Sequence, residues 1–101
     1  MPRFRYSRRA LHEFTWFKAY YETLTKESHD AAMAHFFKLL ILLHAHPEMG
    51  RPAESTERRS FSIPKTPFTL LYRKRGEILE IGRLIDQRSS NYLKDVKDWL
   101  K

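Results

Sequence analysis

The hydrophobic period of this chain changes from helical to strand-like near Arg59, and that change limits the folds open to it. Before this point, apolar residues recur mainly at intervals of three and four, as on one face of an α-helix. From Arg59 the period becomes two, through Phe61 and Ile63, and the apolar runs FTLLYR and ILEIGRLID follow, which is typical of β-strands. A chain of 101 residues has room for one small core. We therefore expect a single α+β domain spanning residues 1–101.

Two amphipathic helices are predicted before the change of period. Ser7 is a suitable N-cap for the first helix, whose apolar face is formed by Leu11, Phe14, Phe17, Tyr21 and Leu24. The second helix is expected to start behind Ser28 and to stop at Pro47 and Gly50. Its wide apolar face consists of Ala32, Met33, Phe36, Phe37, Leu40 and Leu43. The two helices should form a hairpin.

Short strands and turns complete the predicted order. Arg3–Tyr6 reads as a short strand, PKTP separates the first two strands of the second half, and KRGE supplies a turn around Gly76. A last helix over Asn91–Lys101 is expected to place Leu93, Val96 and Leu100 on one face. PEMGRPAESTE reads as a loop between the halves. The order β-α-α-β-β-β-α predicts a helical hairpin on one face of a small, twisted, mainly antiparallel sheet whose other face is at least partly open.

Composition narrows the possible partners. Nineteen Lys and Arg residues against twelve Asp and Glu residues give a net charge of +7, which attracts nucleic acid, an anionic membrane surface or an acidic protein without choosing among them. The chain has no cysteine, and its apolar stretch LLILL is too short to span a bilayer, so we expect a soluble cytoplasmic protein. The histidines do not cluster and no glycine-rich phosphate loop is present, so neither a metal nor another cofactor is expected.

Arginines gather where the predicted strands start and end. Arg73, Arg83 and Arg88 are expected to line a shallow basic rim at the edge of the helical cover. Strand alternation puts Arg83 on the side of Leu79 and Ile81, where it would be partly buried and need a carboxylate or carbonyl partner.

A purely structural interpretation of the same arginines remains open. Arg59, Arg73 and Arg83 could instead form ion pairs with Glu77, Glu80 or Asp86. Trp16 and Tyr20, which flank the apolar face of the first helix, are interpreted as packing at the edge of the core rather than as a platform for stacking bases.

Several short motifs occur together along most of the chain: SRRAL at the first helix, HPEMGRP after the second, Arg59 at the next strand, then PKTPFTLLYR and EIGRLIDQR. In this order they resemble the ParE/RelE superfamily of toxins from bacterial type II toxin-antitoxin systems, and within it the ParE-like, plasmid-stabilisation branch. The resemblance implies a toxin that is neutralised by a small cognate antitoxin in a hetero-oligomer. It also implies one of two targets, because ParE-type toxins poison DNA gyrase whereas RelE-type toxins cut mRNA on the ribosome.

The resemblance to the nuclease branch is partial. RelE-like proteins tend to end the last strand with a His or Lys beside an Arg, followed by a Tyr; this chain keeps Arg88 and Tyr92 but has Asp86 and Gln87 where the basic residue is often found. Metal-independent RNA cleavage needs a base, an acid and cations near the phosphate. A non-enzymatic gyrase poison is therefore favoured, with target-binding residues Arg59, Arg73, Arg83, Arg88 and Tyr92. Arg88 follows the last strand and Tyr92 begins the terminal helix, so both are expected to be exposed. The alternative is a ribosome-dependent endoribonuclease that uses Arg59, Arg83, Arg88 and Tyr92, and a third possibility is a degenerate relative that only binds antitoxin.

Overall fold

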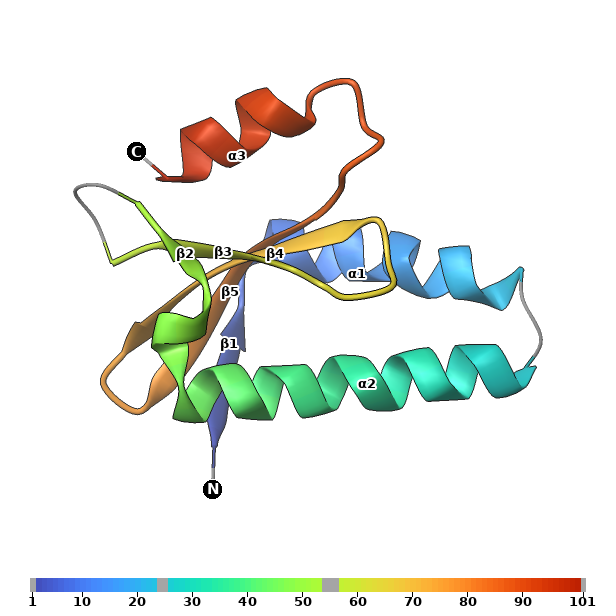
Figure 1. The fold of residues 1–101 in the computed structure, drawn as a ribbon, viewed down its shortest axis with the longest axis horizontal. Helices are drawn as coiled ribbons and strands as arrows, with labels where there is room; N and C mark the ends of the chain where they lie inside the picture. Colours follow the sequence, from blue (N-terminus) through green and yellow to red (C-terminus); the bar gives the residue numbers. More distant parts are fainter. Residues whose placement is uncertain (1, 24–25, 54–56, 101) are drawn as a thin grey trace.

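A computed structural model describes residues 2–23, 26–53 and 57–100, with the backbone alone described at 26–29. The predicted α+β class is confirmed, and the predicted elements occur in the expected order, with an additional 3₁₀ helix and a two-residue strand in the segment predicted as a loop (Figure 1). The elements are β1 (Arg3–Tyr6), α1 (Arg8–Glu22), α2 (Lys26–Ala45), the 3₁₀ helix η1 (Pro47–Met49), β2 (Arg51–Pro52), β3 (Arg59–Ser62), β4 (Phe68–Arg75), β5 (Ile78–Asp86) and α3 (Tyr92–Leu100). None of the helices in these ranges is both long and apolar enough to cross a bilayer.

The strands form one five-stranded sheet in the order β1-β5-β4-β3-β2. β1 runs parallel to β5, and the other neighbouring pairs are antiparallel. The turn between β4 and β5 contains Gly76 at a φ of 57°, a left-handed conformation that glycine adopts without steric cost, as KRGE predicted. Figure 1 shows α2 on one side of the sheet and α3 on the other.

Ser7 connects the start of α1 to the sheet. Its hydroxyl accepts a hydrogen bond from the Ala10 backbone N–H at 2.9 Å, which confirms the predicted N-cap, and donates to the Gly82 carbonyl at 2.7 Å. The expected cap of α2 is wrong, because that helix begins at Lys26 and already includes Ser28. Leu24, predicted on the apolar face of α1, lies outside the described residues.

The main core lies between the helical hairpin and the sheet. The Phe17 ring contacts Tyr21, Phe36 and Phe68 at centroid distances of 4.9 to 5.2 Å. Leu40 and Leu43 of α2 are buried with the residues that β4 and β5 turn toward the helices, which are Phe68, Leu70, Tyr72, Leu79, Ile81 and Leu84. The predicted apolar faces are wider than the sheet can cover, since Leu11 and Phe37 remain 54% and 47% exposed.

A bulge at Gly82 changes the side on which Arg83 lies. Leu71 of β4 pairs with Arg83, whereas the next residue, Tyr72, pairs with Ile81, so Gly82 is an extra residue in β5. Because of it, both Ile81 and Leu84 belong to the core under the hairpin. The predicted alternation, which placed Arg83 with Ile81, is therefore wrong.

α3 covers part of the second face of the sheet. Its Trp99 ring lies directly over Gly82, where any Cβ would overlap the indole, and the Arg58 guanidinium lies 4.4 Å from the ring centroid on top. The predicted inward face of α3 is wrong in part, because Leu93 is 71% exposed. The helix is instead oriented by Trp99, since only the glycine at position 82 leaves room for a large ring.

The segment predicted as a loop wraps around Tyr72. The Tyr72 hydroxyl accepts a hydrogen bond from the Gly50 N–H at 2.9 Å and donates one to the Pro47 carbonyl at 2.6 Å. A side chain at position 50 would overlap this hydroxyl. Burial raises the pKa of Tyr72, so it remains a neutral donor. Part of HPEMGRP is thus ordered as η1 and β2.

Candidate target-binding cleft

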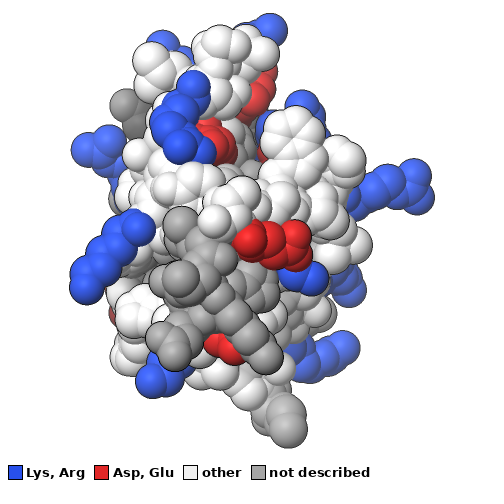
Figure 2. Space-filling view, turned by 90° about the vertical axis from the view of Figure 1, so that its right-hand side faces the viewer, with Lys and Arg blue, Asp and Glu red and all other residues white. Residues whose placement is uncertain are grey.

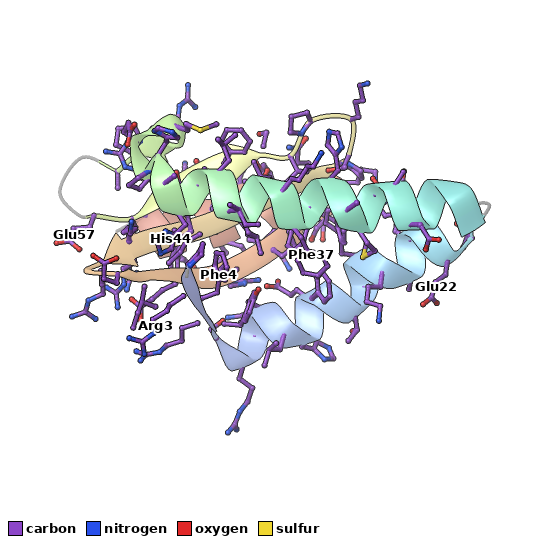
Figure 3. The ribbon with its side chains drawn as sticks, turned by 90° about the horizontal axis from the view of Figure 1, so that it is seen from below. Arg3, Phe4, Glu22, Phe37, His44 and Glu57 are labelled. Carbon is purple, nitrogen blue, oxygen red and sulfur yellow. The ribbon has the colours of Figure 1, made fainter. Side chains whose placement is uncertain are left out.

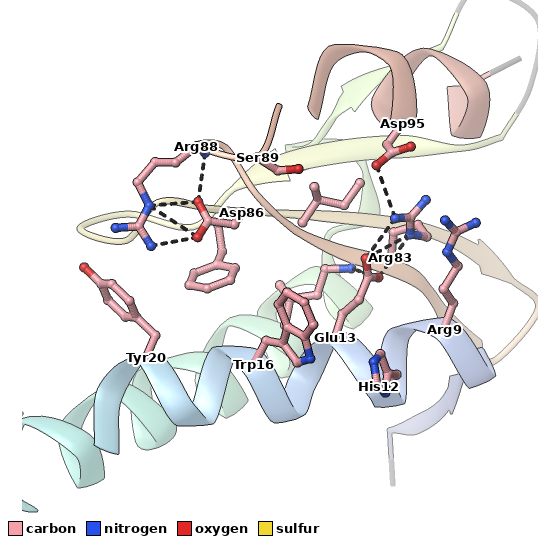
Figure 4. Close-up of a pocket in the computed structure, with 13 residues that line it drawn as sticks. Arg9, His12, Glu13, Trp16, Tyr20, Arg83, Asp86, Arg88, Ser89 and Asp95 are labelled. Carbon is pink, nitrogen blue, oxygen red and sulfur yellow. Dashed lines mark hydrogen bonds and ion pairs between the residues drawn. The ribbon is translucent and has the colours of Figure 1, made fainter. Parts of the chain in front are cut away.

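A hollow of about 420 Å³ opens between α1 and the connection from β5 to α3 (Figure 4). Its aromatic lining comes from Trp16, Tyr20 and Phe68. Charged side chains from four segments surround these rings, namely Arg9 and Glu13 of α1, Arg83 and Asp86 of β5, Arg88 of the connection and Asp95 of α3. The cleft therefore combines apolar ring surface with both signs of charge.

Arg83 is held between two carboxylates on one side of the cleft. Its guanidinium donates to both oxygens of Glu13 at 2.9 to 3.1 Å and lies 3.5 Å from Asp95. The side chain is 11% exposed, so the prediction that Arg83 is partly buried and paired with a carboxylate is confirmed. Burial alone would lower the pKa of Arg83, but the hydrogen bonds and charge of Glu13, together with Asp95, raise it.

Glu13 reaches Arg83 because β1 is shorter than β5. Pairing between the two strands ends at Tyr6 and Ile81, so the edge of β5 beyond that point has no strand beside it. A Glu13 carboxylate oxygen accepts the Leu84 backbone N–H at 3.0 Å and so satisfies this edge. The main partner of Arg83 is therefore a residue of α1, 70 positions away, and not Glu77, Glu80 or Asp86 as the structural interpretation proposed.

Arg88 lies on the opposite side of the cleft and is the more accessible arginine. It forms a two-point ion pair with Asp86, with nitrogen–oxygen distances of 2.7 to 3.3 Å, and its guanidinium sits 4.9 Å from the centre of the Tyr20 ring. The hydrogen bond from Arg88 lowers the pKa of Asp86 despite partial burial. The Arg88 side chain is 59% exposed, as expected for a residue that follows the last strand.

Tyr92 does not share this cleft and is half-buried, which corrects the expectation that it is exposed. Its hydroxyl exchanges a hydrogen bond of 2.8 Å with Thr69 Oγ1, which also accepts from the Gln87 side chain at 2.9 Å. These partners are neutral. They join the start of α3 to β4.

The two remaining predicted residues lie elsewhere in the sheet. Arg59 donates to the Gly50 carbonyl at 2.9 Å and holds the wrapped segment against β3. Arg73 forms an ion pair with Glu80 at 2.7 Å, in agreement with the structural interpretation of that arginine. Of the predicted arginines, only Arg83 and Arg88 line the cleft between α1 and the β5–α3 connection.

Trp16 is the cleft residue that the sequence reasoning missed. It was interpreted as edge-of-core packing, but its side chain is 68% exposed beside His12, 6.0 Å between ring centres. Tyr20 does pack against the core, 5.8 Å from Phe68. The spacing of four from His12 to Trp16 to Tyr20 could have indicated one aromatic stripe on α1.

Two carboxylates of the cleft are already paired with arginines. Glu13 and Asp86 each accept hydrogen bonds from an arginine, and the lowered pKa of Asp86 keeps it ionised, so it cannot act as a general acid near neutral pH. Within the described ranges, no three His, Cys, Asp or Glu side chains converge as a metal site. Trp16 and Arg88 remain accessible to a partner molecule.

Two solved structures share this architecture. The chromosomal ParDE toxin-antitoxin system from P. aeruginosa matches with a TM-score of 0.65 and 22% identity, over 85% of this chain and 96% of that one. The isolated E. coli RelE toxin matches with a TM-score of 0.57 and 16% identity, over 97% of this chain and 98% of that one. At such identities the likeness is one of fold, and it places the chain in the class of small α+β domains with the ParE/RelE architecture.

The family follows from the sequence. Residues 4–91 match the model of the ParE toxin of the type II toxin-antitoxin system, parDE. The chain therefore belongs to the ParE toxin family, as its motifs suggested. No functionally curated protein matches it.

Proposed function

We propose that this protein arrests bacterial growth by binding DNA gyrase, without cutting RNA, and that the cleft between α1 and the β5–α3 connection contributes to the contact. The observation that carries the proposal is the pairing of the cleft carboxylates with arginines. Such a site offers ring surface and positive charge for binding, and RNA cleavage would need a base and an acid other than these paired carboxylates. The protein would act in the cytoplasm, where gyrase is found.

Trp16 and Arg88 are the side chains best placed to contact a target. Trp16 is a large ring that is mostly exposed, and Arg88 presents a guanidinium already oriented by Asp86 and Tyr20. Aromatic residues and arginine dominate the binding energy of many protein interfaces because they bury much surface with few rotatable bonds or provide several donors. A partner that covers the cleft would bury both.

The direct test compares two activities of the purified protein. We expect inhibition of gyrase supercoiling and no cleavage of mRNA in a reconstituted translation system. Trp16→Ala and Arg88→Ala should each weaken inhibition at least tenfold with little change in melting temperature. The controls are Leu93→Ala, which removes an equally exposed apolar side chain, and Lys97→Ala, which removes an exposed positive charge on α3.

Tyr92→Phe distinguishes the alternative. If the protein cleaves mRNA and leaves gyrase untouched, and if Tyr92→Phe abolishes that cleavage, the endoribonuclease reading replaces the proposal. Under the gyrase proposal, Tyr92→Phe removes one hydrogen bond to Thr69 and leaves inhibition within about threefold, since a neutral hydrogen bond is worth roughly 1 kcal/mol.

A cognate acidic antitoxin is the second partner that we propose. An apolar groove of about 220 Å³ between β1, α1 and α2 is lined by Tyr6, Leu11, Phe14, Phe36 and Phe37, among others. Figure 3 shows Phe37 between the two helices. An acidic segment that folds on binding would cover this groove and be attracted by the net charge of +7.

Co-expression with the product of the neighbouring reading frame tests the antitoxin. We expect a stable complex and restored growth. Phe37→Asp should abolish the complex, while Leu42→Asp, at a similar exposure on α2 but outside the groove lining, should preserve it. A complex that survives Phe37→Asp would show that the antitoxin binds another surface.

A further inference from the structure

A second concentration of positive charge lies on the sheet face that carries α3, at the end nearest the β4–β5 turn. Phe4 and Tyr6 pack against the core, so the alternating residues Arg3 and Arg5 of β1 point to the opposite face. By the same alternation, Arg73 and Arg75 of β4 join them, because Tyr72 is buried under the hairpin. We call these four residues the arginine platform.

One carboxylate holds the platform together. Glu80 of β5 lies between Arg5 and Arg73 in the sheet register, and Ile78 lies between Arg3 and Arg75. The Glu80 oxygens are 2.7 Å from Arg73, 3.5 Å from Arg5 and 3.9 Å from Arg75. Three arginines around one carboxylate leave an excess of positive charge, and Arg3 adds to it.

The outer arginines of the platform remain accessible. The side chains of Arg5 and Arg75 are 65% and 60% exposed, whereas that of Glu80 is 17% exposed. An arginine has five N–H donors, so ion pairing to a shared carboxylate leaves donors on each guanidinium for a further ligand. Pairing also restricts the guanidiniums before a ligand arrives, which reduces the entropy cost of binding.

The platform continues into a groove beside α3. A hollow of about 300 Å³ is lined by Arg5, Arg58, Arg73 and Trp99, among others. Trp99 is packed between Gly82 and the Arg58 guanidinium, so its ring faces are already covered and offer no surface on which an unpaired base could stack. The groove therefore presents guanidinium groups rather than ring faces.

We propose that the arginine platform binds the phosphate backbone of duplex DNA. Two residues along a strand advance about 6.7 Å, which is close to the rise of two phosphates of one DNA strand along the duplex axis, at about 3.4 Å each. The regular spacing of arginines along the strands therefore matches the regular spacing of phosphate charges along DNA. An irregular acidic polypeptide has no such regular spacing of negative charge. Figure 2, which views the end with the α1–α2 connection, shows Lys and Arg side chains scattered around the outline instead.

This inference extends the proposed function, because gyrase holds duplex DNA, and it rests on that function only for the choice of ligand. The platform lies apart from the cleft, since none of its four arginines is among the residues that line the cleft. A toxin with both surfaces could contact the enzyme through one and its DNA through the other.

The test measures binding of the pure protein, without gyrase, to a fluorescent 30-base-pair duplex by anisotropy across a salt series. Arg5→Gln/Arg75→Gln should weaken binding at least tenfold and reduce the slope of log K against log salt by about two, since each phosphate contact contributes about 0.9. Lys18→Gln/Lys38→Gln removes the same charge from exposed positions on the helical hairpin and should change affinity less than threefold. Glu80→Gln should strengthen binding, because it removes the carboxylate charge that Arg5, Arg73 and Arg75 of the platform share.

Each contrary outcome overturns the inference. Equal losses in the two double variants would show attraction by net charge alone. Tighter binding of single-stranded DNA or duplex RNA, or displacement of the duplex by polyglutamate at equal charge concentration, would assign the surface to another ligand. Gyrase inhibition without DNA binding would overturn this inference only, and DNA binding without gyrase inhibition would overturn the proposed function only. Melting temperatures of all variants verify folding.

Discussion

Glu13 is the cleft residue that binds both a side chain and the backbone of β5. Its carboxylate accepts hydrogen bonds from the Arg83 side chain and from the Leu84 backbone, and it is 18% exposed. Removing Glu13 leaves the Leu84 N–H without its side-chain acceptor and the partly buried Arg83 with Asp95 alone, which costs more than the pair itself contributes. The residue is therefore structural first, although it lines the cleft.

Two substitutions of Glu13 should separate its roles. We expect Glu13→Ala to lower the free energy of unfolding by roughly 3 kcal/mol, because Arg83 and the Leu84 N–H both lose a partner. Glu13→Gln keeps an oxygen for Leu84 and should cost about half as much. Urea denaturation measures both, with the exposed Glu22→Gln as control. Equal losses for Ala and Gln would mean that the Leu84 contact contributes nothing.

The titration of Glu80 should make the free energy of unfolding depend on pH in the acidic range. The hydrogen bond from Arg73 lowers its pKa, against a smaller opposing effect of burial. A lowered pKa in the folded state contributes stability that is fully present above the unfolded value of about 4.3 and is lost as pH falls through the folded value. We expect the free energy of unfolding to decline from about pH 5 downward, and to decline less in Glu80→Gln. Urea denaturation at several pH values between 3 and 7 would show a parallel decline in both proteins if Glu80 were not responsible.

At the scale of elements, the position of α3 depends on the packing of Trp99 over Gly82. Trp99 needs the space over Gly82, and its indole N–H is buried without a hydrogen-bond partner among the described residues. An unpaired buried donor costs roughly 1 to 3 kcal/mol, which offsets part of the gain from burying the ring. The docking of α3 should therefore be weak compared with the packing of the helical hairpin.

Gly82→Ala tests this docking. The added methyl group would overlap the Trp99 ring, so we expect α3 to leave its position while the sheet and hairpin stay folded. Tryptophan fluorescence should shift to the red and the hydrogen exchange of α3 should accelerate, with the amides of β4 still protected. Gly76→Ala is the control for backbone strain, since position 76 has open space but a φ of 57°. Cooperative loss of the whole fold in Gly82→Ala would show that α3 is integral to the core.

At the scale of the whole molecule, stability rests on the layer between hairpin and sheet. Leu40 is 1% exposed there, and Leu40→Ala should cost roughly 2 to 5 kcal/mol through the cavity it leaves. Because small domains are stable by only about 5 to 15 kcal/mol, we expect this variant to lose toxicity through unfolding. We expect the melting temperature and the growth inhibition to decrease together in Leu40→Ala. Arg88→Ala should decrease growth inhibition alone. Full toxicity of Leu40→Ala would contradict this account of the core.

The sequence by itself determined the class of fold, the order of the elements and the family. Periodicity and turn residues are local properties, so the change near Arg59, the Ser7 cap and the Gly76 turn could be predicted from neighbours along the chain. The motifs HPEMGRP and TPFTLLYR were visible as well, but their physical meaning was not: Gly50 and Pro47 belong to the hydrogen-bonding environment of Tyr72, 22 and 25 positions away.

Only the tertiary structure decided which side chains meet. The bulge at Gly82 reversed the side on which Arg83 lies, and it is defined by the pairing of β5 with β4, which no local pattern marks. The length of β1 decided that Glu13 would satisfy the open edge of β5 and thereby bind Arg83. Charges were countable from the sequence, but their pairing depends on strand register and helix placement, which long-range packing sets. For that reason the basic rim predicted as one surface became a cleft beside α1 and a separate platform on the sheet.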